Sequence, residues 1–196
     1  MPFIEQYTNQ EQALLLWLAR ESVARGVYGK GVESLIECDV SVRLKKNRAC
    51  FVTLKVNGQL RGCIGNLEAN SSLVDAVVRN SYLAAFRDQR FQPVSEAELA
   101  VLEYEVSVLT PMVSLDIVSE ADLLAKIRPG IDGLVFEAEG HRSTFLPSVW
   151  EQLTQSEEFL SQLRKKAGLA ANYWSDNVQC WTYQVIKIGA PISDPC

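Results

Sequence analysis

A thiol and a guanidinium lie two residues apart in the segment Leu-Arg-Gly-Cys-Ile-Gly at positions 60–65. A cysteine attacks as its thiolate, and a neighbouring cation such as Arg61 favours that form. The planar fork of Arg61 can also bind a carboxylate or phosphate of a substrate. Gly62 and Gly65 carry no side chain, so a substrate or partner can approach their backbone closely. The segment predicts a site with Cys63 as nucleophile and Arg61, Gly62 and Gly65 as binding residues.

Both reactive residues of this segment also have a structural interpretation. Free cysteines are among the most buried residues, so Cys63 can simply pack on Val52. Arg61 can form an ion pair within the protein, for example with Glu105. The functional and structural interpretations of Arg61 both predict that it meets a carboxylate.

Two acidic residues can move protons at such a site. Glu105 lies on the polar side of a strand predicted over residues 101–109, where partial burial would perturb its pKa and suit acid-base work. On an exposed sheet face it would be inert. Glu68 follows the 60–65 segment and can act as a general base or cap the next turn.

A polar loop after the second predicted helix contains Asp88 and Arg90. They can bind a ligand, or they can pair with each other, which we favour. His141, the chain's one histidine, lies near a predicted hairpin turn and is expected to be solvated. Because the chain lacks a second imidazole, metal sites that need two are excluded.

An Asn-Gly dipeptide at 57–58 separates two runs rich in strand-forming residues, 49–56 and 59–64. This pattern predicts a hairpin with a type I′ turn. A regular two-residue turn would place Cys63 opposite Val52. Arg61 would by the same spacing lie opposite a core residue, so that both reactive side chains share one face of the hairpin.

The other predicted elements combine helices with tightly connected strands. They are helices over 8–24, 72–86 and 156–167, the strand over 101–109, a hairpin over 133–145 and a final strand over 178–188. Thr8 and Glu11 are the expected capping box of the first helix, Ser95 and Glu98 are expected to cap a short helical turn, and Gly168 is the expected cap of the third helix. This order predicts an α+β fold, a mostly antiparallel sheet flanked by helices, and one domain over residues 8–190.

Composition limits the possible functions. The chain has 196 residues, of which 47% are hydrophobic, a net charge of −5 and five scattered cysteines. The acidic balance counts against a nucleic-acid partner, and the cysteines are expected to be free thiols in a reducing cytoplasm. No secretory leader, membrane span, metal-ligand spacing or cofactor fingerprint is visible, so we expect a cytoplasmic protein with no membrane contact, metal or cofactor.

Several ordered motifs resemble those of the AMMECR domain family. The 60–65 segment resembles its signature hexapeptide, and the later motifs follow in order over roughly residues 10–188. They are Phe-Arg-Asp-Gln-Arg-Phe at 86–91, Glu-Val-Ser-Val-Leu at 105–109, Pro-Gly-x-x-Gly at 129–133, Thr-Phe-Leu-Pro-x-Val-Trp at 144–150 and Lys-Ala-Gly-Leu at 166–169. Gln89 stands where the family usually has proline, which would loosen the loop around Asp88 and Arg90.

The resemblance implies an AMMECR-like fold with a larger sheet-and-helix body and a smaller subdomain. It also implies a bacterial or archaeal setting, the AmmeMemoRadiSam system, with a Memo-type protein and a radical S-adenosylmethionine enzyme as partners. One hypothesis is a component of a modification pathway that uses Cys63 on a small anionic substrate. The alternative is a non-catalytic module that docks a partner at the same surface.

Overall fold

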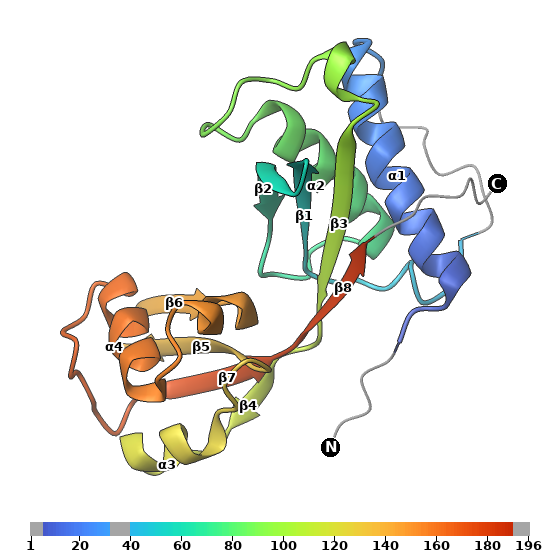
Figure 1. Ribbon diagram of the computed structural model, residues 1–196. Helices are drawn as coiled ribbons and strands as arrows, with labels where there is room; N and C mark the ends of the chain where they lie inside the picture. Colours follow the sequence, from blue (N-terminus) through green and yellow to red (C-terminus); the bar gives the residue numbers. More distant parts are fainter. Residues whose placement is uncertain (1–5, 32–39, 190–196) are drawn as a thin grey trace. The chain divides into compact units, whose positions relative to one another are not determined.

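The computed structural model describes residues 6–31 and 40–189, which divide into two compact units (Figure 1). The first unit runs to Leu109 and resumes at Ile186, and the second comprises Thr110–Val185. The predicted domain, residues 8–190, spans both units. None of the helices in the described ranges is long and apolar enough to cross a membrane.

The first unit combines a four-stranded sheet with two long helices. The strands are ordered β2-β1-β3-β8, so β2 lies at an edge. Its elements are α1 (Asn9–Val27), β1 (Cys50–Val56), β2 (Gln59–Gly65), α2 (Leu73–Phe86), the 3-10 helix η1 (Glu96–Glu98), β3 (Leu102–Leu109) and β8 (Val185–Gly189).

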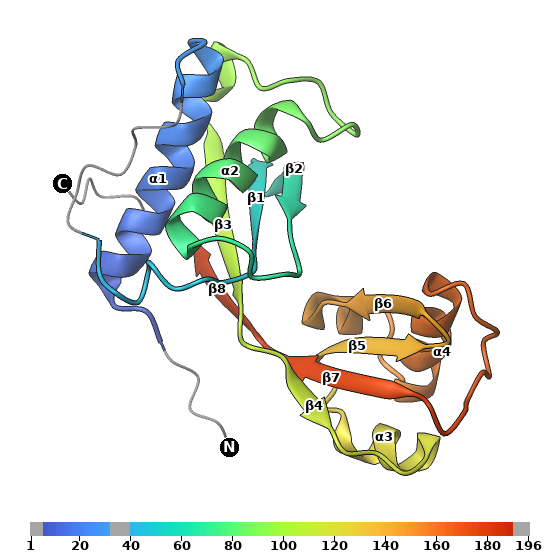
Figure 2. The same cartoon turned by 180° about the vertical axis from the view of Figure 1, so that it is seen from behind.

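Both helices cover the same face of this sheet (Figure 2). Because side chains alternate along a strand, every second residue of β1 and β3 packs beneath the helices. The buried strand residues include Cys50, Val52, Leu54, Tyr104, Val106 and Val108. We call the other side of the sheet, opposite α1 and α2, the outward face.

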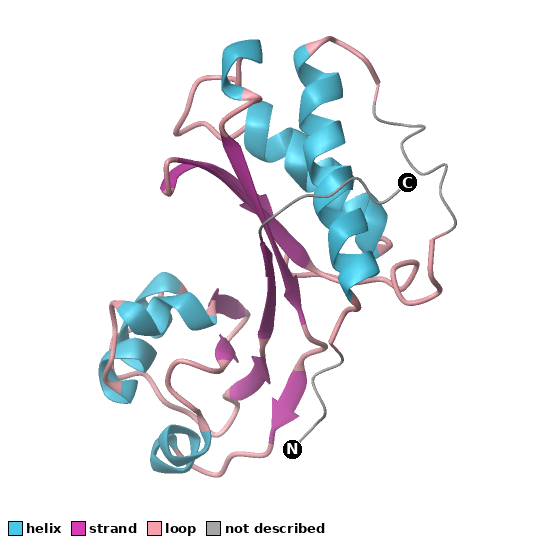
Figure 3. Ribbon diagram, turned by 45° about the vertical axis from the view of Figure 1, so that its right-hand side comes forward, coloured by secondary structure: helices cyan, strands magenta, loops and turns pink. Residues whose placement is uncertain are grey.

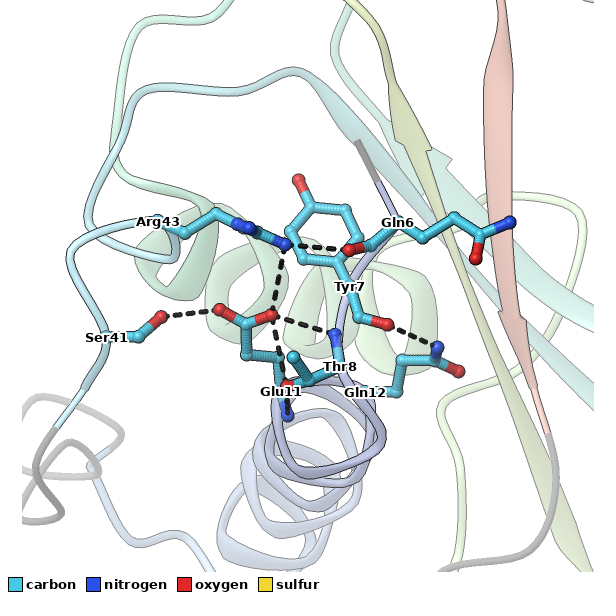
Figure 4. Close-up of polar contacts among 7 residues, drawn as sticks. All are labelled: Gln6, Tyr7, Thr8, Glu11, Gln12, Ser41 and Arg43. Carbon is cyan, nitrogen blue, oxygen red and sulfur yellow. Dashed lines mark hydrogen bonds and ion pairs between the residues drawn. The ribbon is translucent and has the colours of Figure 1, made fainter. Parts of the chain in front are cut away.

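The start of α1 is fixed by a carboxylate with several partners (Figure 4). Glu11 accepts the backbone N–H of Thr8, and the Thr8 hydroxyl accepts the N–H of Glu11, which completes the predicted capping box. The same carboxylate accepts the hydroxyl of Ser41 at 2.7 Å and lies 3.5 Å from the guanidinium of Arg43. The first turn of α1 therefore also holds the segment before β1, through the contacts of Glu11 with Ser41 and Arg43.

The second unit has a sheet of order β4-β7-β5-β6. Its elements are β4 (Val113–Leu115), α3 (Glu120–Lys126), β5 (Gly133–Ala138), β6 (His141–Phe145), the 3-10 helix η2 (Pro147–Glu151), α4 (Ser156–Lys166) and β7 (Gln179–Tyr183). Trp150 stacks on Phe159 with ring centroids 3.7 Å apart and donates its indole N–H to the carbonyl of Asp132. This pair lies in the core of the unit.

Helices and strands form separate layers in each unit (Figure 3), and every strand pair with a defined register is antiparallel. The predicted α+β class is therefore confirmed. The predicted end of α4 is also confirmed. Gly168 has a φ of +83°, and the N–H of Leu169 donates to the carbonyl of Arg164, as in a Schellman motif.

Candidate functional site

The β1–β2 hairpin has the predicted turn but not the predicted register. Asn57 and Gly58 both have positive φ angles, 51° and 74°, as a type I′ turn requires. A bulge then interrupts the pairing, because Lys55 pairs with Leu60 while Leu54 pairs with Gly62. The predicted pairing of Cys63 with Val52 is wrong, since one residue of β2 has no partner.

The extra residue is Arg61, and the bulge decides which side chains reach the core. Without it, Arg61 and Cys63 would lie on the face of Val52 and Leu54, beneath α2. With it, Gly62 occupies that face and Cys63 lies on the outward face opposite Thr53. A guanidinium is thereby kept out of an apolar core, where its burial would be costly.

Cys63 is half-buried and lies in a row of polar side chains that crosses three strands. Thr53 of β1 pairs with Cys63 on one side and with Glu105 of β3 on the other. The Thr53 hydroxyl donates to the Cys63 sulfur at 3.3 Å. Sequence reasoning missed Thr53 because it depended on the regular register.

The two glycines of the segment face protein atoms. A Cβ on Gly62 would lie 2.3 Å from the carbonyl oxygen of Ala84 in α2, and one on Gly65 would lie 2.3 Å from the ring of Phe51. Gly62 is thus explained by close packing of α2 on β2. In the structure it is the backbone of α2 that approaches Gly62 closely, and the approach of a substrate or partner to Gly62 and Gly65 stays a prediction.

Asp88 and Arg90 pair with each other, as favoured above, and both also contact Cys63. Asp88 accepts the backbone N–H of Cys63 at 2.9 Å, and Arg90 donates to the Cys63 carbonyl at 3.3 Å. Two further bonds of 2.9 and 2.6 Å join the Arg90 guanidinium to the Asp88 carboxylate. These bonds, together with the Cys63 N–H, hold the pKa of Asp88 well below its usual value despite the opposing effect of burial.

Arg61 meets a carboxylate, as predicted, but the partner is Glu98 and not Glu105. The pair is bidentate, with distances of 2.6 and 3.2 Å. Arg61 lowers the pKa of Glu98 to about 2, against an opposing effect of burial, and Ser95 adds two hydrogen bonds. Glu98 therefore serves both as the capping residue expected for η1 and as the partner of Arg61. Both guanidinium groups lie near the ring of Phe91, with distances to its centroid of 5.9 Å for Arg61 and 5.5 Å for Arg90.

The two expected proton carriers have other partners. Glu105 accepts Lys55 at 3.0 Å, and Glu68 is exposed and accepts the amide of Asn70 at 3.1 Å. Neither carboxylate has a hydrogen bond to Cys63 among the contacts of the described residues. His141 lies in the second unit, where its Nδ1 is 2.8 Å from the carbonyl of Ala167.

The remaining described cysteines are structural. Cys50 and Cys180 are buried, and burial raises the pKa of their thiols to about 11 and about 12. Cys38 and Cys196 lie outside the described residues. Among residues 6–31 and 40–189, no group of three or more His, Cys, Asp or Glu side chains is arranged to hold a metal ion.

Comparison with known proteins identifies the family. The AMMECR1 family profile matches residues 16–188. A protein of Methanothermobacter thermautotrophicus is 38% identical, covering 86% of this chain and 88% of its own, and one of Methanococcus aeolicus is 36% identical over 96% of both. The crystal structure of uncharacterized protein PH0010 from Pyrococcus horikoshii superposes with a TM-score of 0.78 at 30% identity, covering 92% of this chain and 91% of that one. The chain belongs to the AMMECR1 family.

Proposed function

We propose that this AMMECR1-family protein is a non-catalytic docking component, and that its partner binds the outward face of the first unit around Cys63. One observation carries the proposal: the charged groups beside Cys63 are already paired within the chain. Arg61 pairs with Glu98, and Arg90 pairs with Asp88. A nucleophilic cysteine uses a base within hydrogen-bond reach or an adjacent cation that lowers its pKa. Arginines that are already paired with carboxylates of the same chain suit a docking surface better, because their side chains are held in place before a partner binds.

The partner we propose is a Memo-type protein, in a modification pathway that also contains a radical S-adenosylmethionine enzyme. The resemblance of the motifs to those of such systems motivates this choice. The outward face offers the mixture typical of a non-obligate interface. It combines the half-buried Cys63 and Phe51 with the ion pair of Lys55 and Glu105.

The test is the affinity of the purified Memo-type protein for a charge-swapped variant, Arg61→Glu with Glu98→Arg. The swap keeps an ion pair and reverses the charges that a partner meets. It also removes the acceptor of the Ser95 N–H and the donor to the Pro93 carbonyl, so the variant is compared only after its thermal unfolding is shown to match that of the wild-type protein. We expect the affinity to fall by about tenfold or more, the effect of losing one good charged contact. Lys45→Glu reverses a charge at an exposed position before β1, outside the proposed docking surface, and should bind normally. Equal binding of the swapped variant and the wild-type protein contradicts docking at Arg61.

A second candidate is a component that uses Cys63 on a small anionic substrate. The hydrogen bond from Thr53 to the sulfur favours it, because such a bond stabilises a thiolate. The test is turnover of the reconstituted pathway with Cys63→Ser. Full turnover rules out a nucleophilic Cys63, whereas lost turnover with normal partner binding makes catalysis the better description.

A further inference from the structure

The edge of β2 at Cys63 is occupied by side chains instead of a neighbouring strand. β2 is the first strand of its sheet and pairs only with β1 in the described chain. A strand added at this edge would accept the N–H of Cys63 and donate to its carbonyl. The Asp88 carboxylate accepts that N–H, and the Arg90 guanidinium donates to that carbonyl. We call Asp88 and Arg90 the edge clamp.

The two members of the edge clamp are joined to each other and to their own loop by several hydrogen bonds. The Asp88 side chain is only 5% exposed, while that of Arg90 is 55% exposed. Asp88 accepts both the backbone and the side-chain N–H groups of Arg90, and its own carbonyl accepts the N–H of Phe91. A bidentate arginine–carboxylate pair has a defined geometry, so the groups that meet Cys63 are held in place before any partner arrives.

The same loop continues along β2 beyond the clamp. Arg61, two residues from Cys63, donates to the carbonyl of Pro93 at 3.4 Å. The ring of Phe91 contacts the guanidinium groups of both Arg61 and Arg90. Residues 88–93 therefore line the edge of β2 through side-chain contacts, a form of protection against strand addition.

We infer that Asp88 and Arg90 are positioning residues: they take the place of a neighbouring strand at Cys63, close the edge of β2, and hold the backbone of Cys63 in place. The bulge puts the Cys63 side chain on the outward face, and the pair steadies it there for a partner that docks on the face and not by strand addition. The last part rests on the proposed function. The positioning itself does not, and it can be measured in the isolated protein.

The experiment is hydrogen exchange of the Cys63 amide in the full chain, followed by NMR. In the wild-type protein this edge amide should be protected although no strand pairs with it. Asp88→Ala should raise its exchange rate about 10- to 100-fold, because a hydrogen bond to a charged group is lost. Asp88→Asn keeps an acceptor oxygen and should restore part of the protection. Fast exchange in the wild-type protein, or an unchanged rate in Asp88→Ala, overturns the clamp.

Two controls separate positioning from general destabilisation. Gln89→Ala alters an exposed residue between the two members of the clamp and should leave the Cys63 amide protected. Val23→Ala removes a buried side chain of α1 and lowers overall stability without touching the clamp. In each variant the exchange rate of the Cys63 amide is compared with the exchange rates of the amides in the central strand β1. If this ratio rises as much in Val23→Ala as in Asp88→Ala, the loss of protection reflects overall destabilisation and the inference fails.

A second experiment measures the affinity of the purified Memo-type protein for the variants Asp88→Ala and Asp88→Asn. We expect Asp88→Ala to lose affinity by about tenfold or more, as for one displaced contact, and Asp88→Asn to recover part of it. If Asp88→Ala deprotects the amide but binds normally, Asp88 does not position the docking surface, and the proposed function stands. If wild-type protein does not bind although its Cys63 amide is clamped, the proposed function fails and the clamp stands.

Discussion

Thr53 donates a hydrogen bond to the sulfur of Cys63 across the β1–β2 hairpin, with 3.3 Å between the hydroxyl oxygen and the sulfur. The N–H and C=O of Cys63 point away from β1, toward Asp88 and Arg90. Thr53 and Cys63 therefore form a non-hydrogen-bonded cross-strand pair, the type in which facing side chains approach most closely. The bulge at Arg61 creates this pair.

Removing the Thr53 hydroxyl should slow alkylation of Cys63. An O–H group donates a stronger hydrogen bond to a charged sulfur than to a neutral one, and the charged sulfur is the form that attacks the reagent. In Thr53→Val the rate of modification by iodoacetamide at neutral pH should fall about fivefold, for a bond that contributes ~1 kcal/mol. Thr53→Ser retains the hydroxyl and should react at the wild-type rate. A faster reaction in Thr53→Val would show that the hydroxyl shields the sulfur instead of activating it.

Adding a methyl group at Gly62 should destabilise the first unit. The new Cβ would lie 2.3 Å from the Ala84 carbonyl oxygen, so α2 must move. We expect Gly62→Ala to lower the free energy of unfolding by about 1–3 kcal/mol, as overpacking does. Gly189→Ala is the control and should leave stability nearly unchanged, because a Cβ there would have its nearest neighbours at 3.8 Å and the residue has no positive φ. If Gly62→Ala is as stable as the wild-type protein but no longer binds its partner, the result would instead support close approach of the partner to the backbone at Gly62.

The pair of Arg61 and Glu98 should make stability depend on pH in the acid range. The pKa of Glu98 is about 2 in the folded protein, lowered chiefly by Arg61, whereas an unfolded glutamate titrates near ~4.3. The unfolded state therefore binds more protons between these values, so the stabilisation is complete above about pH 4.3 and is lost as pH falls toward 2. Urea unfolding from pH 7 to 2 should show this loss in the wild-type protein and a smaller one in Glu98→Gln. If the free energy of unfolding depends on pH in the same way in the wild-type protein and in Glu98→Gln, the ion pair does not contribute as proposed.

Truncating Glu11 should loosen the start of α1. Glu11→Ala removes the capping box and the acceptor of Ser41. A loss of about 1–2 kcal/mol in the free energy of unfolding is expected for a capping interaction of this kind. Ser41→Ala deletes one bond only and should cost less. Equal stability of Glu11→Ala and the wild-type protein in thermal unfolding would show that the cap contributes nothing.

Local chemistry in the sequence was enough to predict several elements. The Asn-Gly turn, the capping box of α1 and the glycine cap of α4 each depend on residues within one turn of the chain. The register of β2 was not predictable from the turn alone, because it depends on α2. Gly62 carried the available signal, since a glycine inside a strand often marks a bulge and an arginine on a core-facing position is a conflict.

Of the site residues predicted from the sequence, the structure brings Asp88 and Arg90 into contact with Cys63, whereas Glu68 and Glu105 have other partners. Asp88 and Arg90 were expected to pair with each other, but their contacts with Cys63 join residues 25 and 27 positions apart. Arg61 was expected to meet an acid, and its partner Glu98 is reached only because the 88–93 loop runs along β2. Such pairings depend on the path of a loop, which has no periodic signal in the sequence.

The central claim, that the face around Cys63 docks a partner, is tested most directly by isothermal titration of the Memo-type protein into the wild-type chain and the Arg61→Glu, Glu98→Arg variant. We predict saturable binding to the wild-type chain and an affinity weaker by about tenfold or more for the swapped variant, with Lys45→Glu unchanged. Indistinguishable affinities for all three proteins, or no binding to the wild-type chain, would contradict the claim.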